Sequence, residues 1–151
     1  MNRLVISLAS ACLLFGFAIA QNKETSKGAG KGAAAAADNG PVSVERGRYL
    51  VENVAMCGRC HTPHNVAGEG EHSTWLLGGP IGIQATYPIP NYAQVEPRLA
   101  GTPPGTDAEF IRLLMTGISR TGAPPKPPMP KFGMTRSDAA SILAYLKSLS
   151  Q

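Results

Sequence analysis

Two cysteines and a histidine stand close together in the segment CGRCH, residues 57–61. If Cys57 begins a helical turn, Cys60 and His61 follow at positions i+3 and i+4, and the three side chains share one face. Two thiols at this spacing can form thioethers with the two vinyl groups on one edge of a porphyrin, and the imidazole of His61 then lies under the metal. The pattern therefore indicates covalent attachment of a c-type haem.

Other uses of paired cysteines fit this chain less well. A zinc site needs a second pair of ligands, and His64 and His72 are too near to the motif and too few to supply it. A thioredoxin-like dithiol needs a βαβ setting, which the sequence does not offer. A disulfide across two intervening residues closes too small a loop to stabilise a fold well.

A haem iron has two axial positions, and if His61 takes one, the other needs a ligand from elsewhere in the chain. Met129 stands in the segment PPKPPMPKF, where the flanking prolines prevent a helix and keep the chain extended. We therefore expect Met129 to bind the iron, with Met134 as its nearest competitor. The remaining candidates are explained more simply as packing or surface residues: Met56, Met115, His64 and His72.

The first twenty residues form a segment of their own. Arg3 precedes an apolar run that ends in the small-x-small triplet 18–20, which is the layout of a secretory signal peptide cut after Ala20. An uncleaved anchor and a lipoprotein cut before Cys12 are the alternatives. Cleavage after Ala20 removes Cys12, so that Cys57 and Cys60 are the cysteines that remain, and it sends the protein to the periplasm.

Composition separates a tether from a folded domain. Residues 21–40 contain no aromatic and no large aliphatic side chain, so we expect a flexible tether, followed by one domain over residues 41–151. The net charge of +4 is not gathered into the basic stripe that would indicate a nucleic-acid partner. Membrane association is expected only through an uncleaved N-terminus.

Helical periodicity appears in three stretches of the domain. The first covers residues 43–56 with Ser43 as N-cap, the second begins at Thr106 and ends at Gly117, and the third begins at Thr135 or Ser137. No stretch alternates convincingly as a strand would, and glycine- and proline-rich runs fill 78–105 and 122–130. We predict an all-α fold of three to four helices whose long loops wrap around one covalently bound haem. A domain this small, with so many loops, needs a bound group to stabilise it.

These features together resemble a class I monohaem cytochrome c. They are particularly similar to the cytochrome domains that serve as electron-transfer subunits of periplasmic dehydrogenases. The resemblance covers about 43–150, through the segment RGRYLVENVAMCGRCHTPHN, the short stretches GGPIG and IPN, and the whole of 110–149. The combination that is specific to this family is Cys-x-x-Cys-His followed later by Met-Pro and by a helix that ends the domain.

The resemblance also assigns roles to individual residues. Cys57 and Cys60 would form the thioethers, and His61 and Met129 would be the proximal and distal ligands of the iron. The carbonyl of Pro80, after Gly79, would accept a hydrogen bond from the second ring nitrogen of His61. Gly47 would let Tyr145 or Leu146 of the last helix approach the first. The segment 62–105 does not match residue by residue, and its candidates for the haem propionates are Trp75, Tyr87, Asn91 and Tyr92.

The function implied by this resemblance is one-electron transfer in the periplasm, by a carrier that is not an enzyme and whose cofactor is one haem c with its iron. Redox proteins, a dehydrogenase or an oxidase, would be the partners. Two other functions stay open, namely a haem enzyme or gas-binding sensor with a labile sixth ligand, and a relay subunit docked permanently on a dehydrogenase. Four basic residues could steer an acidic partner to the haem edge: Arg59, Arg120, Lys126 and Lys131.

Overall fold

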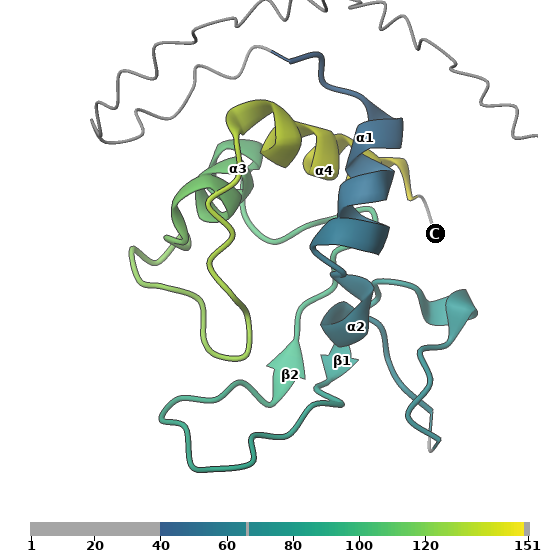
Figure 1. The fold of residues 1–151 in the computed structure, drawn as a ribbon, viewed down its shortest axis with the longest axis vertical. Helices are drawn as coiled ribbons and strands as arrows, with labels where there is room; N and C mark the ends of the chain where they lie inside the picture. The colour runs from purple at the N-terminus through teal and green to yellow at the C-terminus, as the bar shows by residue number, and fades with distance from the viewer. Residues whose placement is uncertain (1–39, 66, 150–151) are drawn as a thin grey trace, which may run out of the picture. The chain divides into compact units, whose positions relative to one another are not determined.

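The computed structural model describes residues 40–65 and 67–149. The expected signal peptide and nearly all of the expected tether lie outside these ranges. The regular structure of the described chain is mainly helical, as predicted, and its helices are joined by long loops (Figure 1). Its helical elements are α1 (Val44–Tyr49), the π-helix η1 (Leu50–Val54), α2 (Gly58–His61), the 3₁₀ turn η2 (His72–Thr74), α3 (Asp107–Thr116) and α4 (Arg136–Ser148).

Two elements depart from the sequence-based expectation. The first predicted helix is α-helical only as far as Tyr49 and then widens into the π-helix η1, with the amide of Ala55 bonded to the carbonyl of Leu50. A pair of two-residue antiparallel strands, β1 (Gly79–Pro80) and β2 (Val95–Glu96), was not predicted. Strands this short are too brief to produce a visible alternation of polar and apolar residues. Within the described ranges, no helix has the length and apolar character needed to cross a membrane.

The predicted helix ends are confirmed by their hydrogen bonds. The side chains of Ser43 and Thr135 accept bonds from backbone amides in the first turns of α1 and α4. Thr106 and Glu109 form a complete capping box at the start of α3, and Gly117 ends that helix with a left-handed φ of 69°. These caps depend on residues next to one another in the chain, which is why the sequence predicts them well.

Helices α1 and α4 cross in close contact at Gly47. A Cβ atom there would overlap the backbone carbonyl of Ser141 and would lie 2.8 Å from the Cβ of Tyr145. On either side of this contact, the Ser43 amide donates to Ser141 Oγ at 3.2 Å, and the Arg46 guanidinium forms an ion pair with Asp138 at 2.8 Å. The glycine inside α1 therefore serves the predicted helix crossing, with Tyr145 rather than Leu146 as the side chain at the contact.

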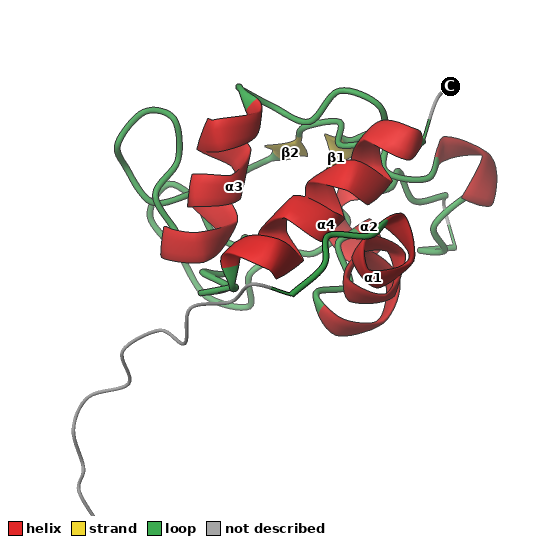
Figure 2. Ribbon diagram, turned by 90° about the horizontal axis from the view of Figure 1, so that it is seen from above, coloured by secondary structure: helices red, strands yellow, loops and turns green. Residues whose placement is uncertain are grey.

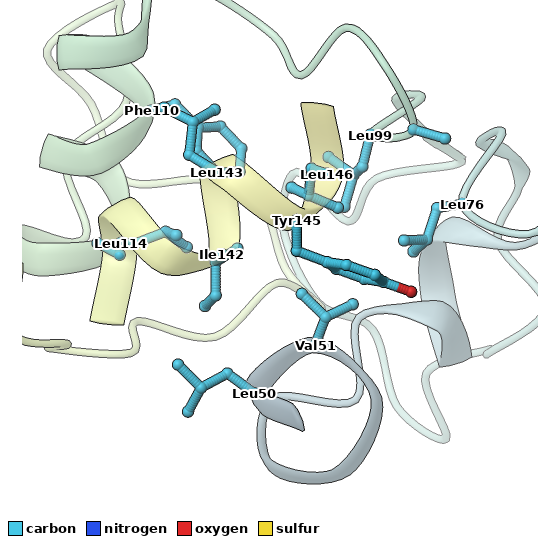
Figure 3. Close-up of a cluster of buried hydrophobic side chains, with 12 residues drawn as sticks. Leu50, Val51, Leu76, Leu99, Phe110, Leu114, Ile142, Leu143, Tyr145 and Leu146 are labelled. Atoms are coloured by element: carbon cyan, nitrogen blue, oxygen red, sulfur yellow. The ribbon is translucent and has the colours of Figure 1, made fainter. Parts of the chain in front are cut away.

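The hydrophobic core forms where α4 lies between α1 and α3 (Figure 2). The ring of Tyr145 lies near Val51 and Leu76 at the centre of the cluster (Figure 3). The hydroxyl of Tyr145 reaches the edge of the core and donates a hydrogen bond of 2.8 Å to Glu52 Oε1. Leu99 and Ala100 join the core because both of their amides donate to the carbonyl of Leu76.

Substitution of Gly47 by alanine is expected to lower the free energy of unfolding by about 2–3 kcal/mol, since the added methyl must push α4 away. Chemical denaturation followed by circular dichroism measures the change. Gly70→Ala is the matched control, because a Cβ at Gly70 meets its nearest neighbour, Thr62 Cγ2, at an ordinary 3.6 Å. Equal stability of the two variants would contradict the crossing.

Removal of the Tyr145 hydroxyl is expected to cost about 1 kcal/mol at pH 7, because the bond to Glu52 is lost. Burial, followed by the bond to Glu52, raises the pKa of Tyr145 above its usual value. A raised folded-state pKa gives stability that is complete below the unfolded value, roughly 10, and is lost as the pH rises further. Unfolding of wild type and Tyr145→Phe should therefore differ at pH 7 and converge above pH about 10, whereas the exposed control Tyr49→Phe should follow wild type at both.

Candidate haem-binding site

The motif residues lie on the single helical turn α2, which begins directly after Cys57. The amides of Cys60 and His61 both donate to the Cys57 carbonyl, at 3.3 and 2.9 Å. The chain enters this turn through Met56, whose φ of 49° lies in the left-handed region. The side chains of Cys57, Cys60 and His61 therefore share one face of the turn, as their spacing predicts.

Both cysteines carry free thiols in the structure. Burial raises the pKa of the Cys57 thiol to about 11, and burial, followed by the negative charge of Glu96, raises the pKa of the Cys60 thiol. A catalytic dithiol requires the opposite shift, because its nucleophile must ionise near neutral pH. The raised pKa values therefore argue against a catalytic dithiol.

An apolar cleft opens at this face of α2. Both cysteines, His61 and Met129 line it together, although Met129 comes from a loop far along the chain. Its apolar walls are formed by side chains of α3, of α4 and of the loops before each of these helices: Leu99, Phe110, Leu114, Phe132, Ile142 and Leu146. The cleft thus brings two thiols, one imidazole and one thioether sulfur to a single apolar surface.

His61 is buried and is held at both its backbone and its ring. The Gly78 amide donates to the His61 carbonyl at 2.8 Å, and the ring Nδ1 lies 2.8 Å from the carbonyl oxygen of Pro97. With its proton on Nδ1, the imidazole donates to Pro97 and leaves Nε2 as the nitrogen for a metal. The expectation that the carbonyl of Pro80 accepts this bond is therefore wrong, and Pro97 takes its place.

The pairing of β1 with β2 explains why Pro97, and not Pro80, accepts the hydrogen bond from His61. Pro80 is exposed and pairs with Val95, whereas Gly79 pairs with Glu96. The preceding Gly78 has a φ of 72°, and a Cβ there would lie 2.6 Å from the carbonyl carbon of Pro97. Because Gly78 has no side chain, the chain at Pro97 can pass close to it and reach the ring of His61.

The proposed second ligand, Met129, has a defined backbone. Its amide donates to the Lys126 carbonyl at 3.2 Å, and the Pro127 carbonyl accepts from the Ala93 amide at 2.7 Å. The competitor Met134 packs against the hydrophobic core, and its amide donates to Leu114 O. The structure therefore brings Met129, and not Met134, to the cleft that holds His61.

The other methionines and histidines occupy different places. Met115 packs against the core, while Met56 lines the rim of the cleft and is 41% exposed. The ring of His64 lies beside Gly82, and its buried Nδ1 has no hydrogen-bond partner among the described residues. His72 is exposed in the turn η2.

The residues considered for the haem propionates do not form one group. Trp75 packs against Gly58 of the motif, where a Cβ would overlap its ring. Tyr87, Asn91 and Tyr92 belong to the loop that joins β1 to β2, and Tyr92 donates its hydroxyl proton to the Ile83 carbonyl at 2.8 Å. Their role as propionate contacts stays a prediction.

The four basic candidates are also dispersed. Arg120 and Lys126 line one cavity next to Met129, whereas Arg59 lines a different one beside His64. The aliphatic part of Lys131 lies over Gly117, so that a Cβ there would come within 2.7 Å of Lys131 Cγ. Of the four, Arg120 and Lys126 therefore share a cavity with Met129, while Arg59 stands on the turn α2 that carries His61.

Sequence reasoning missed two residues beside the ring of His61, Pro97 and Glu96. The available signal for Pro97 was the apolar pair Leu99 and Ala100 just after it, which marks a segment that enters the core. Glu96 gave no signal, because a single glutamate in a loop is normally exposed. In the structure Glu96 is buried in the cleft, and its Oε2 lies 3.8 Å from Nε2 of His61.

The residues of the cleft fit a covalently bound haem. Two free thiols and an imidazole share one face of α2, the imidazole directs Nε2 into an apolar space, and Met129 lines the same space. An apolar lining suits a porphyrin, and the sulfur and nitrogen donors suit its iron. When bound, the group supplies reversible one-electron chemistry, and the chain holds and orients it.

This fold and site define a c-type cytochrome domain. Residues 44–150 match the family model described as Cytochrome c, and the chain belongs to the cytochrome c family. Membership implies a covalently bound haem c with iron and a function in electron transfer. The predicted fold class and family are thereby confirmed.

Two curated proteins are similar to this chain. A diheme cytochrome c-type protein of Cereibacter sphaeroides is 43% identical over 67 residues, which are 44% of this chain and 21% of the relative. The fructose dehydrogenase cytochrome subunit of Gluconobacter japonicus is 30% identical over 109 residues, which are 69% of this chain and 21% of the relative. The matched part thus spans about a fifth of the length of each relative, and the predicted likeness to dehydrogenase cytochrome domains is confirmed.

Proposed function

We propose that this protein carries one electron at a time on a single covalently bound haem whose iron is ligated by His61 and Met129. The observation that carries the proposal is the convergence of both cysteines, His61 and Met129 on one apolar cleft. The proposal of a single haem is supported by the sequence given, in which Cys-x-x-Cys-His occurs once. One such motif attaches one haem.

The proposed ligands suit electron transfer because the chain restrains them. The ring of His61 is fixed by Pro97, and the loop of Met129 is fixed by its prolines and by the bond from Ala93 to Pro127. Ligands that move little between the two oxidation states keep the reorganisation energy low. Paired histidine and methionine ligation also raises the reduction potential.

The same ligation argues for a carrier and against an enzyme or a gas sensor. A haem that activates a substrate or binds a gas needs a free or easily freed axial position. Met129 lines the cleft, its amide is bonded to Lys126 and the carbonyl of Pro127 is bonded to Ala93, so in our proposal this methionine fills the second axial position. The periplasm is the proposed location, because residues 1–20 have the layout of an export signal.

Substitution of Met129 by alanine is expected to abolish the methionine-to-ferric charge-transfer band in the near-infrared edge of the oxidised spectrum. Met134→Ala, the matched control, should keep the band, since Met134 packs in the core. In parallel, the reduced wild type should bind carbon monoxide slowly at neutral pH and the Met129→Ala variant should bind it rapidly. Loss of the band in Met134→Ala alone, or rapid binding by wild type, would refute the proposed ligation.

A second candidate function is that of a relay subunit docked on a dehydrogenase. The observation in its favour is the likeness to the fructose dehydrogenase cytochrome subunit, which covers 69% of this chain. In that case the domain would receive electrons from a partner with which it remains bound, and the haem chemistry would be the same.

Purification from the native membrane-free and membrane fractions separates the two functions. A docked subunit is expected to co-elute in size-exclusion chromatography with a larger polypeptide that reduces its haem when a substrate is added. A free carrier should elute at the size of a single domain. Elution as a single domain from both fractions at low and at high salt would rule out permanent docking.

A further inference from the structure

The strand β2 exposes its apolar residue and buries its acidic one. Val95 points outward and is 65% exposed, while the neighbouring Glu96 points inward and is 5% exposed. Successive side chains of a strand face opposite sides, so a shift of one residue would have buried the valine and exposed the glutamate. A carboxylate buried in this way costs free energy unless a positive charge compensates it.

The register that buries Glu96 is fixed by its surroundings. Gly79 pairs with Glu96, and a Cβ at Gly78 would lie 2.6 Å from the carbonyl oxygen of Glu96. The next residue, Pro97, is held by its bond to His61. Glu96 therefore faces the cleft as a consequence of the same contacts that orient the ring of His61.

The carboxylate of Glu96 lies beside the atom that would bind the iron. Its Oε2 is 3.8 Å from Nε2 of His61, and Glu96 lines the cleft together with Cys60. Within the described ranges, the ion pairs of lysine and arginine join Arg46 to Asp138 and Lys147 to Asp107, and neither involves Glu96. Glu96 also lines the neighbouring cavity that Arg120 and Lys126 line, but among the described residues the partner at ion-pair distance from its carboxylate is His61. The carboxylate of Glu96 therefore shares one cleft with the nitrogen of His61 that would bind the iron.

We propose that the buried carboxylate of Glu96 sets the reduction potential of the haem by favouring the ferric over the ferrous state. This proposal rests on the proposed ligation of the iron by His61. Oxidation of a bound haem would add one positive charge, and a carboxylate that lines the same apolar cleft would stabilise the more positive state. Glu96 thus acts on the haem through its charge alone. It lowers the reduction potential that histidine and methionine ligation raises.

The test compares midpoint potentials of the purified haem-bearing protein, wild type and Glu96→Gln, by spectroelectrochemical titration at neutral pH. Glutamine keeps the size of the side chain and removes its charge. We expect the ratio of ferrous to ferric protein at a fixed applied potential to rise about tenfold, equivalent to about 59 mV for a one-electron couple. Glu71→Gln, an exposed glutamate outside the cleft, is the matched control and should leave the ratio unchanged.

The optical spectra separate this proposal from the proposed ligation. If Glu96→Gln keeps the methionine-to-ferric band and its potential equals that of wild type, the role of Glu96 is refuted while the ligation stands. If wild type lacks the band, the proposed ligation by Met129 is refuted, independently of Glu96. Should Glu96→Gln fail to accumulate, Glu96→Asp and Glu96→Asn form a second pair that differs only in charge. A potential of the Asn variant no higher than that of the Asp variant would overturn the proposal.

Discussion

The hydrogen bond between His61 Nδ1 and the carbonyl of Pro97 connects the haem-attachment motif to the rest of the domain. It joins a one-turn helix to a segment that also forms β2 and sends Leu99 and Ala100 into the core. The bond selects the tautomer of the imidazole and directs Nε2 into the cleft. The same segment carries Glu96 inward, so one segment decides both the orientation of the His61 ring and the burial of the carboxylate beside it.

The crossing of α1 and α4 at Gly47 positions the haem-attachment motif relative to the core. The close approach of the two backbones fixes the start of the chain segment that leads through η1 to α2. The widened turns of η1 and the left-handed Met56 then turn the chain so that Cys57 faces the cleft. π-Helical turns are frequently found at functional sites, since they redirect side chains without breaking the helix.

Local features were predictable because their causes are local. The N-caps Ser43, Thr106 and Thr135 and the terminal Gly117 satisfy backbone groups only a few residues away, and the Cys-x-x-Cys-His spacing places its side chains on one face of any helical turn. Choosing Met129 over Met134 also followed from local sequence, since prolines exclude it from a helix. The acceptor for His61 was predicted wrongly as Pro80, because two prolines in similar loops differ only in where the strands bring them.

The sequence by itself was enough to predict the family, the cofactor and the residues proposed to hold it, since thioether and ligand chemistry depend on residue type and short spacing. Only the tertiary structure decided which carbonyl orients His61 and which side of β2 is buried. Those outcomes depend on a strand register and on the small size of Gly78, which together bring residues 36 positions apart into contact. A one-residue change of register would place Val95 in the cleft and Glu96 in solvent, with no change in the local preferences of either segment.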